Sequence, residues 1–198
     1  MILKDLDSQD SHKRAACIRQ LGQMDIERGD CPEILFNKLE EALADPEPGV
    51  RKETVMTLAF LMKSENAFSI ITPLLDDPIL DVRSNTLAAL SFIGVRPTSD
   101  VLEKLIADFL HAPEPEIRDR CARALGRLKI FQARSHLLEL AKNDSSSSVR
   151  AAAVIGIGMM KQADSQLKSE LIRLLDSETS QGVISAINET LSIIISNK

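Results

Sequence analysis

The feature that most constrains the fold of this chain is a sequence pattern that returns every 32 to 35 residues. In each copy, a turn containing proline or aspartate leads into an apolar–arginine pair, and a run of small residues follows that ends in Leu-Gly or a close variant. The apolar residue of the pair, or its equivalent in the last copy, recurs at Val50, Val82, Ile117, Val149 and Val183. A period in the low thirties is typical of stacked helical hairpins, none of which can bury its apolar face alone.

The length and composition of the chain fit such a stack. The chain has 198 residues, which is enough for about six repeats, and we expect a single solenoid over residues 1–198. No apolar run reaches the ~18 residues that a membrane span needs, and the three cysteines lack metal-ligand spacing. We therefore expect a cytoplasmic protein with no membrane segment, no metal and no cofactor.

Helical periodicity and turn residues place the expected helices. Pro73 should bend or shorten the helix that contains it, because proline lacks a backbone N–H. Asp100 and Glu103 have the spacing of a capping box, which predicts a helix start at Val101. The expected helices cover residues 11–24, 33–43, 50–63, 67–75, 82–93, 101–110, 115–129, 132–142, 148–160, 165–175 and 183–196.

The consensus of the copies, Asp-Pro-x-x-x-Val-Arg-x-x-Ala-x-x-Ala-Leu-Gly, resembles the HEAT repeat in the short form found in many bacterial and archaeal proteins, including phycobilin-lyase-like ones. The resemblance covers nearly the whole chain. It implies an all-α fold, a right-handed α-α superhelix of about six helical hairpins, whose second helices line a concave groove. Three positions depart from the pattern: Lys13 replaces the apolar residue of the first copy, Ile184 the arginine of the last, and Ala112 the aspartate of the fourth.

The recurring acidic and arginine residues predict a structural ladder between repeats. An aspartate in the turn can accept free N–H groups at the start of the next helix, and its charge suits that end. Each arginine should reach the aspartate of its own or a neighbouring copy, and Arg118, whose own turn has no aspartate, is expected to be freer than the others. The alternative is a row of anion-binding arginines. The ladder residues are Asp45, Arg51, Asp77, Arg83, Arg118, Asp144 and Arg150, with Arg14 as the weaker first copy.

The second helices also carry a stripe of residues that we expect to face the groove. Counted from each arginine, positions two, five and nine lie on one side, away from the core positions three, four, seven and ten. The centre of the stripe holds three arginines with apolar residues on both sides, which favours an acidic, partly apolar peptide or helix as the partner. The predicted partner-binding residues are Met56, Phe60, Phe92, Arg120, Arg123, Arg127, Ile155 and Met159.

Two alternatives to this groove surface stay open. Phe60 and Phe92 can instead pack between neighbouring second helices. The three arginines can form a solvated face that is paired with Asp119 and Glu116.

Signals of catalysis are weak in this sequence. His12, His111 and His136 fall in different repeats, none of them beside a carboxylate or cysteine at ligand spacing. The HEAT-like deoxyhypusine hydroxylases hold iron with His-Glu pairs, and no such pair occurs here. Gly156-x-Gly158 lies within an expected helix with no strand before it, so it is a small position of the repeat and not a phosphate-binding loop. We expect no enzymatic activity.

The leading interpretation is an interaction or scaffold module that binds a protein partner along its groove. A second interpretation, taken from the resemblance, is a phycobilin-lyase-type factor in which the arginines meet the propionates of a tetrapyrrole. An alkylpurine glycosylase-like DNA binder is a third, disfavoured by the net charge of −5 and by the absence of Trp and Tyr.

Both ends of the chain are apolar, with Met-Ile-Leu at residues 1–3 and Leu-Ser-Ile-Ile-Ile at residues 191–195. Solenoids need polar capping units. The apolar ends therefore predict end-to-end self-association or a place within a longer array.

Overall fold

The computed structural model describes residues 5–23, 33–62, 64–161 and 165–196. Within these ranges all regular structure is helical and no strand occurs, so the all-α expectation is confirmed. The chain divides into two compact units, Met1–Val95 and Arg96–Lys198, which we call unit 1 and unit 2 and describe one at a time. The single solenoid over residues 1–198 stays a prediction.

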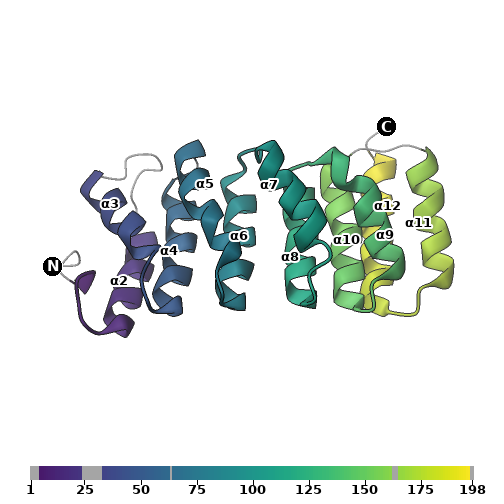
Figure 1. The fold of residues 1–198 in the computed structure, drawn as a ribbon. Coiled ribbons are helices and arrows are strands. Elements are labelled where there is room, and N and C mark those ends of the chain that lie inside the picture. The colour runs from purple at the N-terminus through teal and green to yellow at the C-terminus, as the bar shows by residue number, and fades with distance from the viewer. Residues whose placement is uncertain (1–4, 24–32, 63, 162–164, 197–198) are drawn as a thin grey trace. The chain divides into compact units, whose positions relative to one another are not determined.

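In unit 1 the second helices of successive repeats pack side by side, α2 against α4 and α4 against α6. The first helix of each hairpin packs on its own second helix, α3 on α4, and α5 with η1 on α6. Figure 1 shows these helices in purple and blue. Their bounds are α2 Ser11–Gln23, α3 Glu33–Ala42, α4 Pro48–Leu61, α5 Glu65–Ile71, the 3₁₀ helix η1 Thr72–Asp76 and α6 Leu80–Ile93.

Unit 2 repeats the same two-layer arrangement. Helices α8, α10 and α12 form one layer with α10 in the middle, and η2, α9 and α11 pack on them in turn (Figure 1). The bounds are α7 Ser99–Lys104, the π-helix η2 Leu105–Phe109, α8 Pro115–Arg127, the 3₁₀ helix η3 Phe131–Ala133, α9 Arg134–Asn143, α10 Ser147–Met160, α11 Ser165–Ser177 and α12 Gln181–Ser196.

The turn residues explain most helix boundaries. Pro48 and Pro115 each occupy the first turn of a helix, where the missing N–H costs nothing, and Pro73 lies in 3₁₀ helix η1, as expected. Gly94 ends α6 with a φ of 77°, a left-handed conformation that glycine adopts without strain. The predicted ends at Met24 and Lys63 lie outside the described residues.

The predicted capping box at Asp100 is wrong. Helix α7 begins at Ser99, so Asp100 lies inside its first turn, and the residue before the helix, Thr98, makes no side-chain cap hydrogen bond. An acidic residue in a first turn still favours the positive end of the helix dipole. The sequence signal was therefore electrostatic and not a cap.

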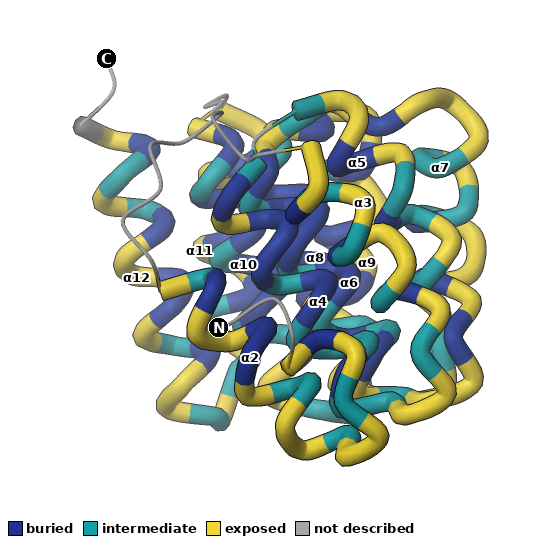
Figure 2. Tube along the Cα trace, turned by 90° about the vertical axis from the view of Figure 1, so that its left-hand side faces the viewer, coloured by how far each residue is buried: buried dark blue, intermediate teal, exposed yellow. Residues whose placement is uncertain are grey.

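The core of each unit lies between its two layers of helices. Figure 2 shows buried residues concentrated along the second helices. Helix α10 is deeply enclosed, with Val149, Val154 and Ile157 almost fully buried. Cys17 and Cys121 are buried at equivalent repeat positions, and burial raises the pKa of each thiol. Both cysteines are therefore packing residues, as expected from their place in the repeat.

Consecutive second helices approach through small residues. In unit 2 a Cβ added to Gly126 of α8 would lie 2.4 Å from the Cα of Gly156 in α10. In the next contact Gly158 faces Thr190 of α12, and a Cβ on Gly158 would lie 2.8 Å from its Oγ1. Gly126 and Gly158 lie eight positions after Arg118 and Arg150. The residues that they meet, Gly156 and Thr190, lie six positions after the same site of the next repeat. Small residues at these two positions let neighbouring helices pack closely.

The described helices also bear on the membrane expectation. None of them combines the length and the apolar character that would be needed to cross a lipid bilayer.

Candidate functional site

Four ion pairs tie successive repeats together inside the two units. Each uses two parallel hydrogen bonds between an arginine and the carboxylate of the following repeat, the strongest geometry for this pairing. The Nε–O distances are 2.7 Å for Arg14–Asp45, 2.6 Å for Arg51–Asp77, 2.7 Å for Arg118–Asp144 and 2.8 Å for Arg150–Glu178.

Each ladder arginine also binds the turn of its own repeat. Arg51 Nη1 donates to the carbonyls of Asp45 and Pro46 at 2.8 and 3.2 Å, and Arg83 makes the same pair of bonds to the carbonyls of Asp77 and Pro78. One guanidinium therefore holds its own turn and the next repeat at once.

The carboxylates in turn accept backbone N–H groups, as Asp45 does from Glu47 at 2.9 Å and Asp144 from Ser146 at 2.9 Å. Burial alone would raise the pKa of Asp144, but the bonds from Arg118 and from the Ser146 N–H outweigh it and hold that pKa below its ordinary value.

The expectation that Arg118 is freer than the other arginines is wrong. Its Nε and Nη2 donate to Asp144 at 2.7 and 2.9 Å, and its Nη1 donates to the carbonyls of Ala112 and Pro113 at 2.7 and 3.0 Å. The missing aspartate at residue 112 does not matter to Arg118, because its own turn supplies backbone carbonyls and the next repeat supplies the carboxylate.

A fall in pH is expected to weaken the Arg150–Glu178 link. Hydrogen bonds from Arg150 and from the N–H groups of Ser180 and Thr179 lower the pKa of Glu178 from 4.5 to about 2. A carboxylate with a depressed pKa stabilises the fold fully above its unfolded-state pKa, and that stability is lost as pH falls from about 4.5 towards 2.

Urea unfolding of Glu178→Gln and of the native chain at a series of pH values tests this expectation. The variant should be less stable at neutral pH, and the difference should shrink through this window. A difference that is constant from neutral pH to the acid end would contradict the role given to Glu178.

On the second helices of unit 2, the predicted arginine and apolar residues all reach the surface. Arg120 and Arg127 are exposed and Arg123 is half-buried on α8, while Ile155 and Met159 are half-buried on α10, which packs directly against α8. We call these five residues the unit 2 face. None of them is sealed in the core.

One arginine of this face has a partner on its own helix. Arg123 Nε donates to Asp119 at 2.8 Å, and the Arg123 side chain remains 39% exposed. Within the described residues Arg120 and Arg127 form no ion pair. The solvated, self-paired alternative therefore describes Arg123 alone and leaves two guanidinium groups available to a ligand.

On unit 1 the predicted stripe contains an aromatic pair. The rings of Phe60 on α4 and Phe92 on α6 meet edge to face with centroids 4.7 Å apart. Phe60 nevertheless stays 41% exposed, and Met56 is half-buried. These phenylalanines thus pack between neighbouring second helices and leave part of one ring at the surface.

The stripe is narrower than expected at position two of the last repeats. Ala152 and Ala186 are buried, where the helical count placed them on the groove side. Position two lies next to core position three, and closely packed second helices cover small side chains there.

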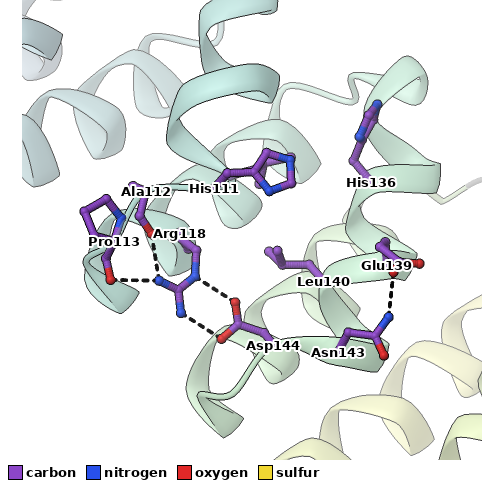
Figure 3. A pocket seen from close by; sticks show the side chains of 10 residues that line it. His111, Ala112, Pro113, Arg118, His136, Glu139, Leu140, Asn143 and Asp144 are labelled. Atoms are coloured by element: carbon purple, nitrogen blue, oxygen red, sulfur yellow. Dashed lines mark hydrogen bonds and ion pairs between the residues drawn. The ribbon is translucent and has the colours of Figure 1, made fainter.

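A cavity of about 520 Å³ lies beside the Arg118–Asp144 link, and the sequence analysis did not predict it. The turn after η2 supplies His111, and α9 supplies His136, Glu139 and Leu140, as Figure 3 shows. We call this cavity the histidine notch. Its remaining lining residues are Leu110, Ala112, Pro113, Arg118, Asn143 and Asp144.

The described residues include no cluster of three or more His, Cys, Asp or Glu side chains arranged to hold a metal ion. Glu139 accepts a hydrogen bond from the amide of Asn143 at 2.6 Å. The sequence analysis missed the notch because the two histidines come from different repeats, 25 residues apart in the chain, and only the stacking of repeats brings them to one cavity.

Two family models match this chain. One, described as HEAT repeats, matches residues 103–192, and the other, described as non-SMC mitotic condensation complex subunit 1, matches residues 13–121. Together the two matches run from the first arginine copy to the last second helix. No curated protein matches the chain.

Solved structures support the same fold. The Escherichia coli protein YibA is 21% identical, with a TM-score of 0.62, covering 96% of this chain and 80% of that one. An archaeal HEAT-like repeats protein from Thermococcus onnurineus is 15% identical, with a TM-score of 0.55, covering 99% and 86%. A computationally designed armadillo repeat protein for modular peptide recognition is 19% identical, with a TM-score of 0.57, covering 97% and 98%.

The hairpin period, the arginine–carboxylate ladder and the HEAT-repeat model that matches residues 103–192 agree with one another, and the solved structures share the fold. This chain belongs to the HEAT-repeat family.

Proposed function

We propose that this protein is a non-enzymatic interaction module that binds a protein partner carrying an acidic, partly apolar segment. The observation that carries the proposal is the unit 2 face, where Arg120 and Arg127 lie exposed on α8, and Ile155 and Met159 reach the surface on α10, the helix that packs against α8. Arginine binds carboxylates through two parallel hydrogen bonds and lies against apolar groups at little desolvation cost. Methionine adapts its shape to different apolar surfaces.

The ladder arginines are poor candidates for this role. The guanidinium groups of Arg51, Arg118 and Arg150 each engage a carboxylate and two backbone carbonyls. Anion binding there would first break a link between repeats. We therefore assign ligand binding to the arginines outside the ladder.

The partner should contact α8 with carboxylates and α10 with apolar side chains. Helix α10 carries no charged residue after Arg150, so the apolar part of a ligand can lie along it without burying a charge. On unit 1, the exposed part of Phe60, with Met56 and Phe92, supplies a second apolar contact of the kind predicted from the stripe.

Charge reversal on the unit 2 face tests the proposal. The probe is a fluorescein-labelled synthetic helix with glutamates on one side and leucines on the adjacent side, and the measurement is fluorescence anisotropy. Replacing Arg123 and Arg127 together by Glu should abolish binding while helicity is kept, and the melting temperature should fall only slightly, because the exposed Arg123–Asp119 pair is lost. Binding to the native chain should weaken as salt is added, because exposed charges are screened.

The matched control changes the same amount of charge on another face of the unit. Lys168 and Arg173 are exposed on α11, and replacing both by Glu should leave probe binding intact. Equal loss of binding in both variants would show attraction by overall charge only, and unchanged binding in the Arg123/Arg127 variant would exclude the unit 2 face.

The tetrapyrrole alternative makes a different prediction about the same arginines. A bilin bound there would give the protein a visible absorption band, and a peptide-binding module would show none. The proposal of a protein partner is therefore tested by an absorbance spectrum before any binding assay.

A further inference from the structure

The histidine notch lies beside a ladder link, and two other ladder links have a structurally equivalent place. Beside Arg14–Asp45 there is a smaller cavity of about 180 Å³. Its lining residues Leu6, Asp7, Arg14, Lys38, Glu41 and Asp45 occupy the repeat positions of Leu110, His111, Arg118, His136, Glu139 and Asp144. The side chains in the smaller cavity can therefore be compared directly with those in the histidine notch.

In the smaller cavity an ion triplet spans the two repeats. Lys38 Nζ on α3 lies 2.7 Å from Asp7 Oδ1 of the preceding repeat and 3.7 Å from Glu41 Oε2 on its own helix. The lysine therefore lies between two carboxylates, one of them from the neighbouring repeat, and its side chain occupies the space between the repeats.

The place beside Arg150–Glu178 holds a triplet with the charges reversed. Glu170 on α11 lies 2.7 Å from Lys142 Nζ of the preceding first helix and 3.6 Å from Arg173 on its own helix. A carboxylate is here between two cations. Both triplets place the opposite charge on the neighbouring repeat, so in each case charged side chains of the chain itself pair across the two repeats.

The histidine notch has no such pair. His136 takes the place of Lys38, Glu139 takes the place of Glu41, and His111 replaces the carboxylate of Asp7. Within the described residues the imidazole side chains of His111 and His136 form no hydrogen bond or ion pair, and both residues are exposed. The position that carries an anion in the first repeat therefore carries a second imidazole, and the cavity is correspondingly larger.

We propose that the histidine notch is a carboxylate-binding site that takes a glutamate or aspartate side chain of a partner protein. The ligand carboxylate would lie between His111 and His136, in the role that Asp7 plays for Lys38. Each imidazole can donate one N–H to it, and the apolar side chains of Leu110 and Leu140 can contact the methylene groups of the ligand. Exposed histidine side chains change rotamer freely, so both rings can turn towards the ligand.

The charges around the notch bear on which ligand it takes. Arg118 and Asp144 neutralise each other in the ladder, and Glu139, held by the Asn143 amide, is the one other charged group in the lining. An imidazole N–H can donate to a carboxylate, whereas a cationic ligand would be attracted by Glu139.

This site goes beyond the function proposed above, because it lies between a turn and a first helix and not on the second-helix face. A partner with several acidic residues could contact both places. The two sites are nevertheless separable by mutation, since they share no residue.

The imidazole resonances of the native chain supply a local test, because His12, His111 and His136 are its three histidines. The probe is hexaglutamate, with ring carbon–proton NMR spectra as the readout. The signals of His111 and His136 should shift together and saturate. The His12 signal, from an exposed residue on α2, is the internal control and should stay in place.

A variant that rebuilds the missing pair tests the explanation itself. Replacing His111 by Asp and His136 by Lys recreates the arrangement of Asp7 and Lys38, so the notch should close and the fold should be kept. In a background with Arg120, Arg123 and Arg127 changed to Glu, labelled hexaglutamate should still bind the parent and should lose binding in the His111→Asp/His136→Lys variant.

Three results would overturn the proposal: equal shifts of all three histidines, no shift with hexaglutamate, or a response to hexalysine in its place. Loss of synthetic-helix binding in the arginine background, with the histidine response retained, would separate the notch from the unit 2 face. Failure of the histidine response alone would leave the proposed function standing.

Discussion

Replacing Gly126 by alanine is expected to lower the free energy of unfolding of unit 2 by about 3 kcal/mol. The added Cβ would lie 2.4 Å from both the Cα and the carbonyl oxygen of Gly156. Both atoms belong to the backbone of α10 and cannot turn aside as a side chain would. The two helices must therefore separate, and the buried residues between them lose contacts.

The matched control for this substitution is Gly182→Ala in the same unit. Gly182 lies near the start of α12, and a Cβ there would meet only the Ser180 hydroxyl oxygen at 3.9 Å. Alanine at this helical position should stabilise the unit by about 0.5 kcal/mol or more, because it restricts the unfolded chain. Urea unfolding of both variants measures the difference. A Gly126→Ala variant as stable as the native chain would show that α8 and α10 are not in backbone contact.

Replacing Arg118 by methionine is expected to cost about 3 to 5 kcal/mol, because it leaves a buried charge without its partner. The Asp144 side chain is only 5% exposed, and the carbonyls of Ala112 and Pro113 also lose their donor. The loss should be smaller in acid, where Asp144 can take up a proton. Thermal and urea unfolding at neutral and acid pH measure both effects.

Two further variants separate the charge effect from the loss of packing. Changing Arg118 to methionine and Asp144 to leucine together should recover most of the stability, because no unpaired charge remains. Arg123→Ala removes the more exposed Arg123–Asp119 pair and should cost only about 0.5 kcal/mol. If Arg118→Met and Arg123→Ala cost the same, the ladder would have no special role in holding the repeats together.

The sequence predicts the helices of this fold well, because each boundary depends on local chemistry. The expected helices differ from the observed ones by only a few residues where both are described. Pro48 and Pro115 lie in the first turn of a helix, and Pro73 lies in the 3₁₀ helix η1, where a missing N–H is tolerated. The capping box at Asp100 was wrong because Ser, Thr and Asp residues crowd this helix start, and a spacing rule alone does not choose among them.

Contacts between repeats were harder to predict. The ladder arginines were evident from their spacing, but the sequence left open whether each reaches its own or the neighbouring aspartate. The structure shows both kinds of bond, to its own turn through backbone carbonyls and to the next repeat through the carboxylate. This distinction explains Arg118, which looked unpaired because its own turn has no aspartate. Its carboxylate partner is Asp144 of the next repeat, and its own turn supplies backbone carbonyls.

Only one side of the contact between Gly126 and Gly156 was predicted from the repeat pattern. The small residue after leucine, Gly126 in the fourth copy, was part of the recognised pattern, whereas its partner Gly156 was noted only as a small position within a helix. The sequence analysis did not find the histidine notch, because His111 and His136 belong to successive repeats. Glu139 follows His136 by three residues and also lines the notch, but a single carboxylate at that spacing does not identify a site.

The ladder also has a consequence for how such a chain can grow or shrink over evolution. The repeats with Asp45–Arg51 and Asp144–Arg150 each offer the preceding repeat a carboxylate and the following repeat a guanidinium, so the two junctions of such a repeat use the same complementary groups. Glu178 shows that a glutamate, one methylene longer than aspartate, can take this position and still accept two hydrogen bonds from Arg150. After duplication or deletion of such a hairpin, the flanking repeats would still present complementary groups to each other. The number of repeats could therefore change without any new type of contact.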